Sequence, residues 1–130
     1  MLLFVYGTLK SNQPANHYLT GARFVATATA GPFYRLYDMG WHPALRPSQG
    51  YEEWVWGEVY ALRSPDRVLE ALDAYEGRDF RRVMTRASLE NGPAVMAWVY
   101  EYLRAVPSQR VISSGDWASE KAIMNLCGRG

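Results

Sequence analysis

The sequence has few of the residues on which many kinds of site depend. It has one cysteine, Cys127, so we expect neither an internal disulfide nor a cysteine-based metal cluster, and we expect this thiol near the end to be a bystander. Its two histidines, His17 and His42, lie far apart without ligand-spaced partners, and we therefore expect no metal site. It also has no phosphate-binding loop and no Gly-x-Ser-x-Gly nucleophile motif.

The sequence also lacks a large excess of either charge and lacks a long apolar run. The 14 basic and 13 acidic residues give a net charge of +1, which argues against a nucleic-acid-binding surface. No apolar run reaches membrane-spanning length and residues 1–3 carry no basic leader, so we expect a cytoplasmic protein that does not enter a membrane. A length of 130 residues, 48% of them hydrophobic and without repeats or linkers, fits one domain over 1–130.

Aromatic residues are plentiful, with nine Tyr and five Trp in a chain that is 14% aromatic. Rings with a polar group suit a tightly packed core and also the walls of a small-molecule pocket.

The first notable stretch runs from Leu2 to Lys10. Its apolar start, 2–6, predicts a strand buried on both faces, and Gly7 ends that strand. The polar residues that follow leave backbone N–H groups without partners in a sheet, and such a row of donors can bind a carboxylate or an oxyanion. The plainer interpretation is a tight turn at the end of the strand.

The rest of the chain predicts strands with two helices. Ser64 as N-cap, Pro65 at the first helical position and Gly77 after the last turn predict a helix between them. Alternating or β-branched segments predict the strands, a short helical turn is expected at 15–19, and the two prolines within 41–47 predict a loop. The predicted strands are 23–29, 33–38, 54–62, 80–89 and 94–103, with a hairpin turn at 90–93, and the second helix is 116–126. This pattern predicts an α+β domain with a small, curved, mostly antiparallel sheet or open barrel.

Glu76, the last residue before Gly77, falls on the apolar side of the predicted helix, beside Leu69 and Leu72. Partial burial and the negative end of the helix dipole would both raise its pKa, which suits a proton acceptor near neutral pH. Nearby arginines at 78, 81 and 82 would lower that pKa if they pointed inward. Alternatively, the side chain reaches water past the last turn.

Two other positions stay open on the pattern alone. Glu58 shares a strand face with Trp54, Trp56 and Tyr60, and it either lines a pocket or faces solvent. Gly57 in the same strand indicates a bulge or a close backbone approach.

Several of these segments together resemble the gamma-glutamylcyclotransferase-like family, in particular its small bacterial-type, gamma-glutamylamine cyclotransferase-like members. The motifs are Tyr6-Gly7-Thr8-Leu9, 36–40 with 43–45, Gly57-Glu58-Val59-Tyr60, 72–77 (Leu-Asp-Ala-Tyr-Glu-Gly) and Phe80-Arg81-Arg82. The resemblance extends to about Leu103 and is weaker beyond Pro107. It implies a barrel-like sheet around a cavity.

The resemblance also implies a function. The reaction cyclises a gamma-glutamyl group, releasing 5-oxoproline and a free amine or amino acid from a small-molecule substrate, without metal or cofactor. Glu76 is implied as the general acid/base. The implied substrate-binding residues are Tyr6, Gly7, Thr8, Leu9, Gly40, Arg82 and Tyr100, although for Tyr100 the pattern alone indicates only core or pocket wall. The alternative is a non-catalytic protein that binds small carboxylates on the same scaffold.

Overall fold

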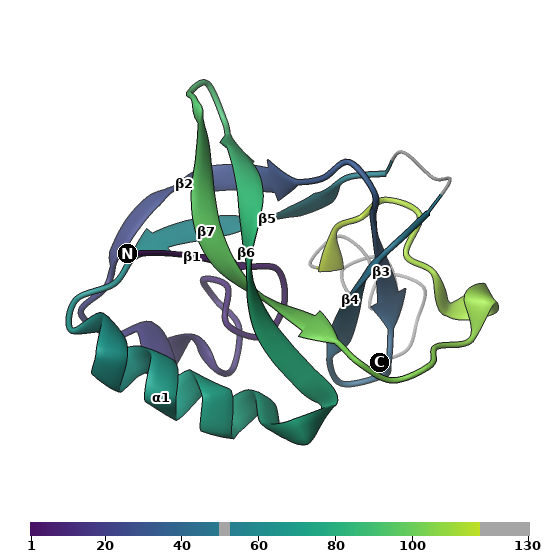
Figure 1. Ribbon diagram of the computed structural model, residues 1–130, viewed down its shortest axis with the longest axis horizontal. Coiled ribbons are helices and arrows are strands. Elements are labelled where there is room, and N and C mark those ends of the chain that lie inside the picture. Colours follow the sequence, from purple (N-terminus) through teal and green to yellow (C-terminus); the bar gives the residue numbers. More distant parts are fainter. Residues whose placement is uncertain (50–52, 118–130) are drawn as a thin grey trace.

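The computed structural model describes residues 1–49 and 53–117 of the chain, and its main feature is a closed five-stranded barrel (Figure 1). The barrel order is β1-β5-β2-β6-β7, and β3 with β4 forms a separate two-stranded sheet. The strands are β1 (Leu2–Val5), β2 (Arg23–Ala30), β3 (Tyr34–Asp38), β4 (Pro43–Pro47), β5 (Val55–Ala61), β6 (Phe80–Leu89) and β7 (Ala94–Tyr102). The helices are α1 (Pro65–Glu76) and the short 3-10 turns η1 (Asn16–Leu19), η2 (Gly77–Asp79) and η3 (Ser108–Arg110).

The expected α+β class and the mostly antiparallel sheet are confirmed. Four of the five barrel pairings are antiparallel, and the exception is β1 with β7, which run parallel where Leu3 lies opposite Trp98. This contact closes a barrel that the sequence predicted to be open, because pairing between the two ends of a sheet leaves no local sequence signal. No helix in residues 1–49 and 53–117 is long and apolar enough to cross a membrane.

Strand β1 is buried on both faces, as its apolar run predicts. Phe4, on one face, packs inside the barrel with Val59 and Val99. Leu3 and Val5, on the other face, pack under α1 with Leu69 and Leu72. The strand is therefore held by two hydrophobic cores at once, and the loop that follows it starts from a well-fixed position.

Helix α1 spans the predicted residues and lies along one side of the barrel (Figure 1). Its apolar residues Leu69 and Leu72 pack in the core with β1. Gly77 follows the helix with φ +75°, a conformation that favours glycine. Ser64 occupies the predicted N-cap position, but it does not cap the helix with its side chain. Ser64 has φ +54° rather than the extended backbone of a usual N-cap, and its side chain makes no capping hydrogen bond.

The segment at 41–47 was predicted to be a loop, and this prediction is also wrong. Pro43 and Pro47 are the first and last residues of β4. Among residues 1–49 and 53–117 this strand pairs with β3 alone, so neither proline interrupts the interior of a sheet. The β3–β4 pair lies beside the barrel, away from α1 (Figure 1). The predicted second helix falls mostly outside the described residues, as does Cys127.

Candidate active site

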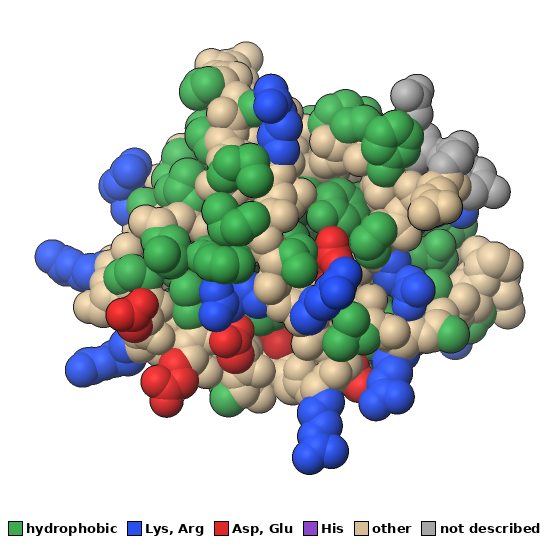
Figure 2. Space-filling model, in the orientation of Figure 1, with side chains coloured by type: hydrophobic (Ala, Val, Ile, Leu, Met, Phe, Trp, Pro, Cys, Tyr) green, Lys and Arg blue, Asp and Glu red, His purple; other side chains and the backbone are tan. Residues whose placement is uncertain are grey.

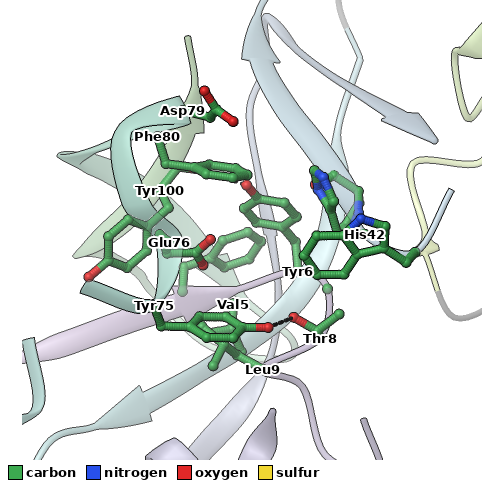
Figure 3. Close-up of a pocket in the computed structure, with 14 residues that line it drawn as sticks. Val5, Tyr6, Thr8, Leu9, His42, Tyr75, Glu76, Asp79, Phe80 and Tyr100 are labelled. Atoms are coloured by element: carbon green, nitrogen blue, oxygen red, sulfur yellow. Dashed lines mark hydrogen bonds between the residues drawn. The ribbon is translucent and has the colours of Figure 1, made fainter. Parts of the chain in front are cut away.

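A cavity of about 110 Å³ opens where β1 ends. Since one water needs about 10–15 Å³ on this measure, the cavity has space for several waters or one small ligand. Its walls come from five segments: β1 with the loop after it, the turn that leads into β4, the end of α1 with the 3-10 turn after it, the start of β6, and β7 through Tyr100 (Figure 3). The lining residues are Phe4, Val5, Tyr6, Gly7, Thr8, Leu9, Trp41, His42, Pro43, Tyr75, Glu76, Asp79, Phe80 and Tyr100.

The loop after β1 presents unpaired amide donors at this cavity. The carbonyl oxygens of Gly7 and Thr8 accept hydrogen bonds from the backbone N–H groups of Lys10 (3.0 Å) and Ala15 (2.9 Å), and that of Leu9 accepts one from the Asn16 side chain (2.8 Å). The N–H groups of Gly7, Thr8 and Leu9 have no acceptor within the described part of the chain. Buried donors without partners are costly, so a ligand oxygen is a favourable acceptor for them.

Glu58 fixes the far end of this loop. Its carboxylate accepts hydrogen bonds from the Ser11 N–H at 2.8 Å and the Ser11 hydroxyl at 2.7 Å, and from the Tyr60 hydroxyl at 3.1 Å. At the near end, a Cβ on Gly7 would clash with the Pro43 ring. Glu58 is not among the cavity-lining residues. The sequence left open whether Glu58 lines a pocket or faces solvent. Its carboxylate instead binds Ser11 and so holds the loop in place.

Glu76 contributes its carboxyl group to the cavity from the end of α1 (Figure 3). Burial raises its pKa from 4.5 to about 7, because the charged form loses hydration there. The neighbouring arginines do not offset this effect, since Arg81 pairs with Glu101 and Arg82 with Asp73. At neutral pH the group is therefore present in both protonation states, as proton transfer in both directions requires.

Two tyrosines connect the walls around Glu76. The Tyr6 hydroxyl donates to the carbonyl oxygen of Tyr100 at 2.6 Å, and burial together with the Glu76 charge raises the pKa of Tyr6 well above its usual range. The Tyr75 hydroxyl and the Thr8 hydroxyl share a hydrogen bond of 2.9 Å across the cavity (Figure 3). The last turn of α1 and the amide loop are thus joined directly.

Six of the eight site residues proposed from the sequence line this one cavity: Tyr6, Gly7, Thr8, Leu9, Glu76 and Tyr100. Gly40 and Arg82 do not. Gly40 lies in the β3–β4 turn, where its N–H donates to the Asp38 carboxylate at 2.8 Å. Arg82 lies on the outer face of β6, against Trp98 and Asp73.

The sequence predicted that loop residues between Gly40 and Tyr51, together with the C-terminal segment, shape the pocket around the leaving group, but it did not single out the residues at the rim of the cavity. Trp41, with 75% of its surface exposed, and His42 come from the β3–β4 turn, and Phe80 opens β6. The His42 ring lies 4.5 Å from that of Trp41 and 5.9 Å from that of Phe80, between ring centroids. Two features of the sequence pointed to such a cluster, the high aromatic content and the predicted loop that contains Trp41 and His42. No group of His, Cys, Asp and Glu in the described residues has a metal-binding arrangement.

The structure thus places a carboxyl group of raised pKa and a row of amide donors at one small cavity. Residues 3–119 match the family described as "Gamma-glutamyl cyclotransferase, AIG2-like". The chain belongs to this family, and the resemblance inferred from the motifs is confirmed.

Individual relatives agree with this assignment. The chain is 34% identical over 119 residues to the gamma-glutamylcyclotransferase family protein YtfP of Escherichia coli K12, covering 90% of this chain and 96% of that protein. The crystal structure of an AIG2-like protein from Mus musculus is 25% identical, with a TM-score of 0.75 over 92% of this chain and 88% of that one. Uncharacterised protein PH0828 from Pyrococcus horikoshii has the same fold, with a TM-score of 0.78 at 24% identity over 100% and 99% of the two chains.

Proposed function

We propose that the protein is a gamma-glutamyl cyclotransferase that releases 5-oxoproline and a free amine or amino acid from a small gamma-glutamyl substrate. The observation that carries this proposal is the meeting of Glu76 and the unpaired N–H groups of Gly7, Thr8 and Leu9 at one cavity. The family to which the chain belongs supports it.

The chemistry assigns a task to each part of the cavity. The α-amine of the glutamyl group attacks its own γ-carbonyl carbon, so a C–N bond forms and closes a five-membered lactam. The bond between that carbon and the leaving nitrogen then breaks. Glu76 takes the proton from the attacking amine and gives it to the leaving nitrogen, and its pKa of about 7 suits both transfers.

The amide donors stabilise charge that the reaction creates. As the amine attacks, the γ-carbonyl oxygen becomes negative, and fixed N–H groups that donate to it lower the barrier without reorganising. The same loop also has donors for the α-carboxylate of the glutamyl group. Because the reaction is intramolecular, the remaining task of the cavity is to hold the substrate folded in the attack geometry.

The test is 5-oxoproline release from a panel of gamma-glutamyl amino acids, peptides and amines. We expect turnover of at least one substrate by the wild type and none by Glu76→Gln, which keeps the shape of the side chain but cannot take the proton. Glu70→Gln is the matched control, since Glu70 is exposed on the same helix and does not line this cavity. Turnover that survives Glu76→Gln would remove Glu76 from the mechanism.

The non-catalytic alternative predicts a different result from the same panel. A binding protein would be stabilised against heat by small carboxylic acids and would release no 5-oxoproline from any substrate. That combination would replace the cyclotransferase proposal.

A further inference from the structure

A charged cluster outside the cavity joins α1 to β6 and β7. The Asp73 carboxylate accepts two hydrogen bonds from the Arg82 guanidinium, Nε to Oδ1 at 2.9 Å and Nη2 to Oδ2 at 3.2 Å. It also accepts the Tyr100 hydroxyl at 2.6 Å. The guanidinium in turn lies 4.4 Å from the centre of the Trp98 ring, within cation–π range. Three elements therefore converge on one carboxylate.

This Asp73 cluster leads directly to the cavity. Tyr100, whose hydroxyl binds Asp73, lines the cavity with its ring and accepts the Tyr6 hydroxyl at its carbonyl oxygen. Asp73 also precedes Glu76 by three residues, so the two lie on adjacent turns of α1, and the Asp73 carbonyl accepts the N–H of Gly77, which ends the helix. Fixing Asp73 consequently fixes the turn that carries Glu76.

We propose that Asp73 and Arg82, neither of which lines the cavity, are positioning residues that hold the Glu76 carboxyl group against the substrate. This inference rests on the proposed function. The arginine acts through the aspartate, and the aspartate acts through the last turn of α1 and through Tyr100.

The partial exposure of the cluster means that its loss should affect the geometry of the site more than the stability of the fold. The Asp73 side chain is 46% exposed and that of Arg82 24%, and ion pairs with this much access to water contribute little to folding. A bidentate Arg–carboxylate pair nevertheless fixes geometry well. Figure 2 shows acidic and basic side chains next to one another along α1, below the hydrophobic side chains that cover β6 and β7. The Arg82 and Tyr100 hydrogen bonds also lower the pKa of Asp73, which keeps it charged at neutral pH.

The neighbouring strand residue offers a matched control. Arg81 also lies on β6 and also pairs with a carboxylate, that of Glu101 on β7 at 3.3 Å, but Glu101 bonds Tyr34 of β3 rather than α1. Arg81→Gln therefore removes an arginine–carboxylate pair from the same strand without touching α1, although here the carboxylate is the buried partner, with 8% of its side chain exposed. Arg82→Lys keeps the charge and loses the two-pronged geometry.

The experiment measures kcat and KM on the best substrate of the panel, together with the melting temperature. For Arg82→Gln and Asp73→Asn we expect kcat to fall about ten- to a hundredfold, because small displacements of a reacting group cost this much. KM should change less than about twofold, and the melting temperature by no more than about 4 °C, as expected for an exposed pair. Arg82→Lys should recover part of kcat. Arg81→Gln should keep the wild-type kcat, whatever the loss of its own ion pair does to the melting temperature.

A readout independent of turnover keeps this test distinct from that of the proposed function. In protein with ¹³C-labelled glutamate, the Glu76 carboxyl resonance is assigned by its loss in Glu76→Gln. At fixed pH it should move in Arg82→Gln and stay in place in Arg81→Gln.

Three results would overturn the positioning role: an unchanged kcat in Arg82→Gln, an equal loss of kcat in both arginine variants, or an unmoved Glu76 resonance. Wild-type protein that releases no 5-oxoproline, while the resonance moves as expected, would instead count against the proposed function alone.

Discussion

Replacing Glu76 by glutamine should stabilise the protein at alkaline pH while abolishing the proposed cyclotransferase activity. Burial raises the pKa of this carboxyl group from 4.5 to about 7, so the folded state binds its proton more tightly than the unfolded state does. Below pH 4.5 the group is protonated in both states and costs nothing. Between pH 4.5 and 7 only the unfolded chain loses the proton, and stability falls; above about pH 7 the whole cost is present.

The stability cost of ionising Glu76 follows from how far burial raises its pKa. At about 1.4 kcal/mol per tenfold change in proton affinity, a rise from 4.5 to about 7 corresponds to about 3 kcal/mol. The side chain keeps some contact with solvent, which lowers the expected cost to about 2 kcal/mol. For a chain of this length such a gain raises the melting temperature by about 5–10 °C. Glutamine carries no charge at any pH and does not incur this cost.

The assay is thermal unfolding of wild type and Glu76→Gln from pH 4 to pH 8.5, followed by circular dichroism. The quantity of interest is the difference between the two melting temperatures, which should be small at pH 4 and grow through pH 7. Glu70→Gln should show no such growth, because Glu70 is exposed. Parallel curves for wild type and Glu76→Gln across the whole range would refute the argument from burial.

Three further substitutions test the parts that hold the site together. Glu58→Gln weakens both hydrogen bonds to Ser11, and we expect KM to rise about fivefold, for a loss of about 1 kcal/mol, with kcat much less affected in the same steady-state assay. Leu72→Ala empties a fully buried site between α1 and the barrel, and chemical denaturation should show a loss of about 3 kcal/mol. Gly7→Ala sets a methyl group against Pro43, so 5-oxoproline release should fall more than tenfold even where circular dichroism shows folded protein.

The sequence predicted the parts of the site that depend on local patterns. The strand–glycine exit at Gly7 and the helix end at Gly77 are both marked by residues within a few positions, and helical periodicity placed Glu76 on the inner side. Gly57 was expected to mark either a bulge or a close backbone approach. The close approach is observed, since a Cβ at Gly57 would clash with the backbone of Val5 and the ring of Phe4. The family assignment depended on these same local segments.

The rest depended on contacts that no local pattern encodes. Trp41 and His42 reach the cavity only because β3 and β4 pair and carry their connecting turn to the end of β1. Alternation along β6 predicts that Arg81 and Arg82 point to opposite faces of the strand, but it does not predict the partner of either. In the structure neither lines the cavity, and Arg82 pairs with Asp73. Ser64 does not cap α1 with its side chain because its backbone has a left-handed conformation, which the residue type alone does not determine.

The parallel contact between β1 and β7 bears on the order in which the molecule assembles. It joins Leu3 to Trp98 across almost the whole described chain, whereas β6 and β7 are linked by a short hairpin with a long ladder. Bringing distant segments together costs the most chain entropy, so barrel closure belongs late in folding. The amide donors follow β1 directly, and closure brings Tyr100 of β7, which lines the cavity, against the Tyr6 hydroxyl at the end of β1. Under mild denaturant, enzymatic turnover should therefore disappear before the far-ultraviolet circular dichroism signal of the remaining strands.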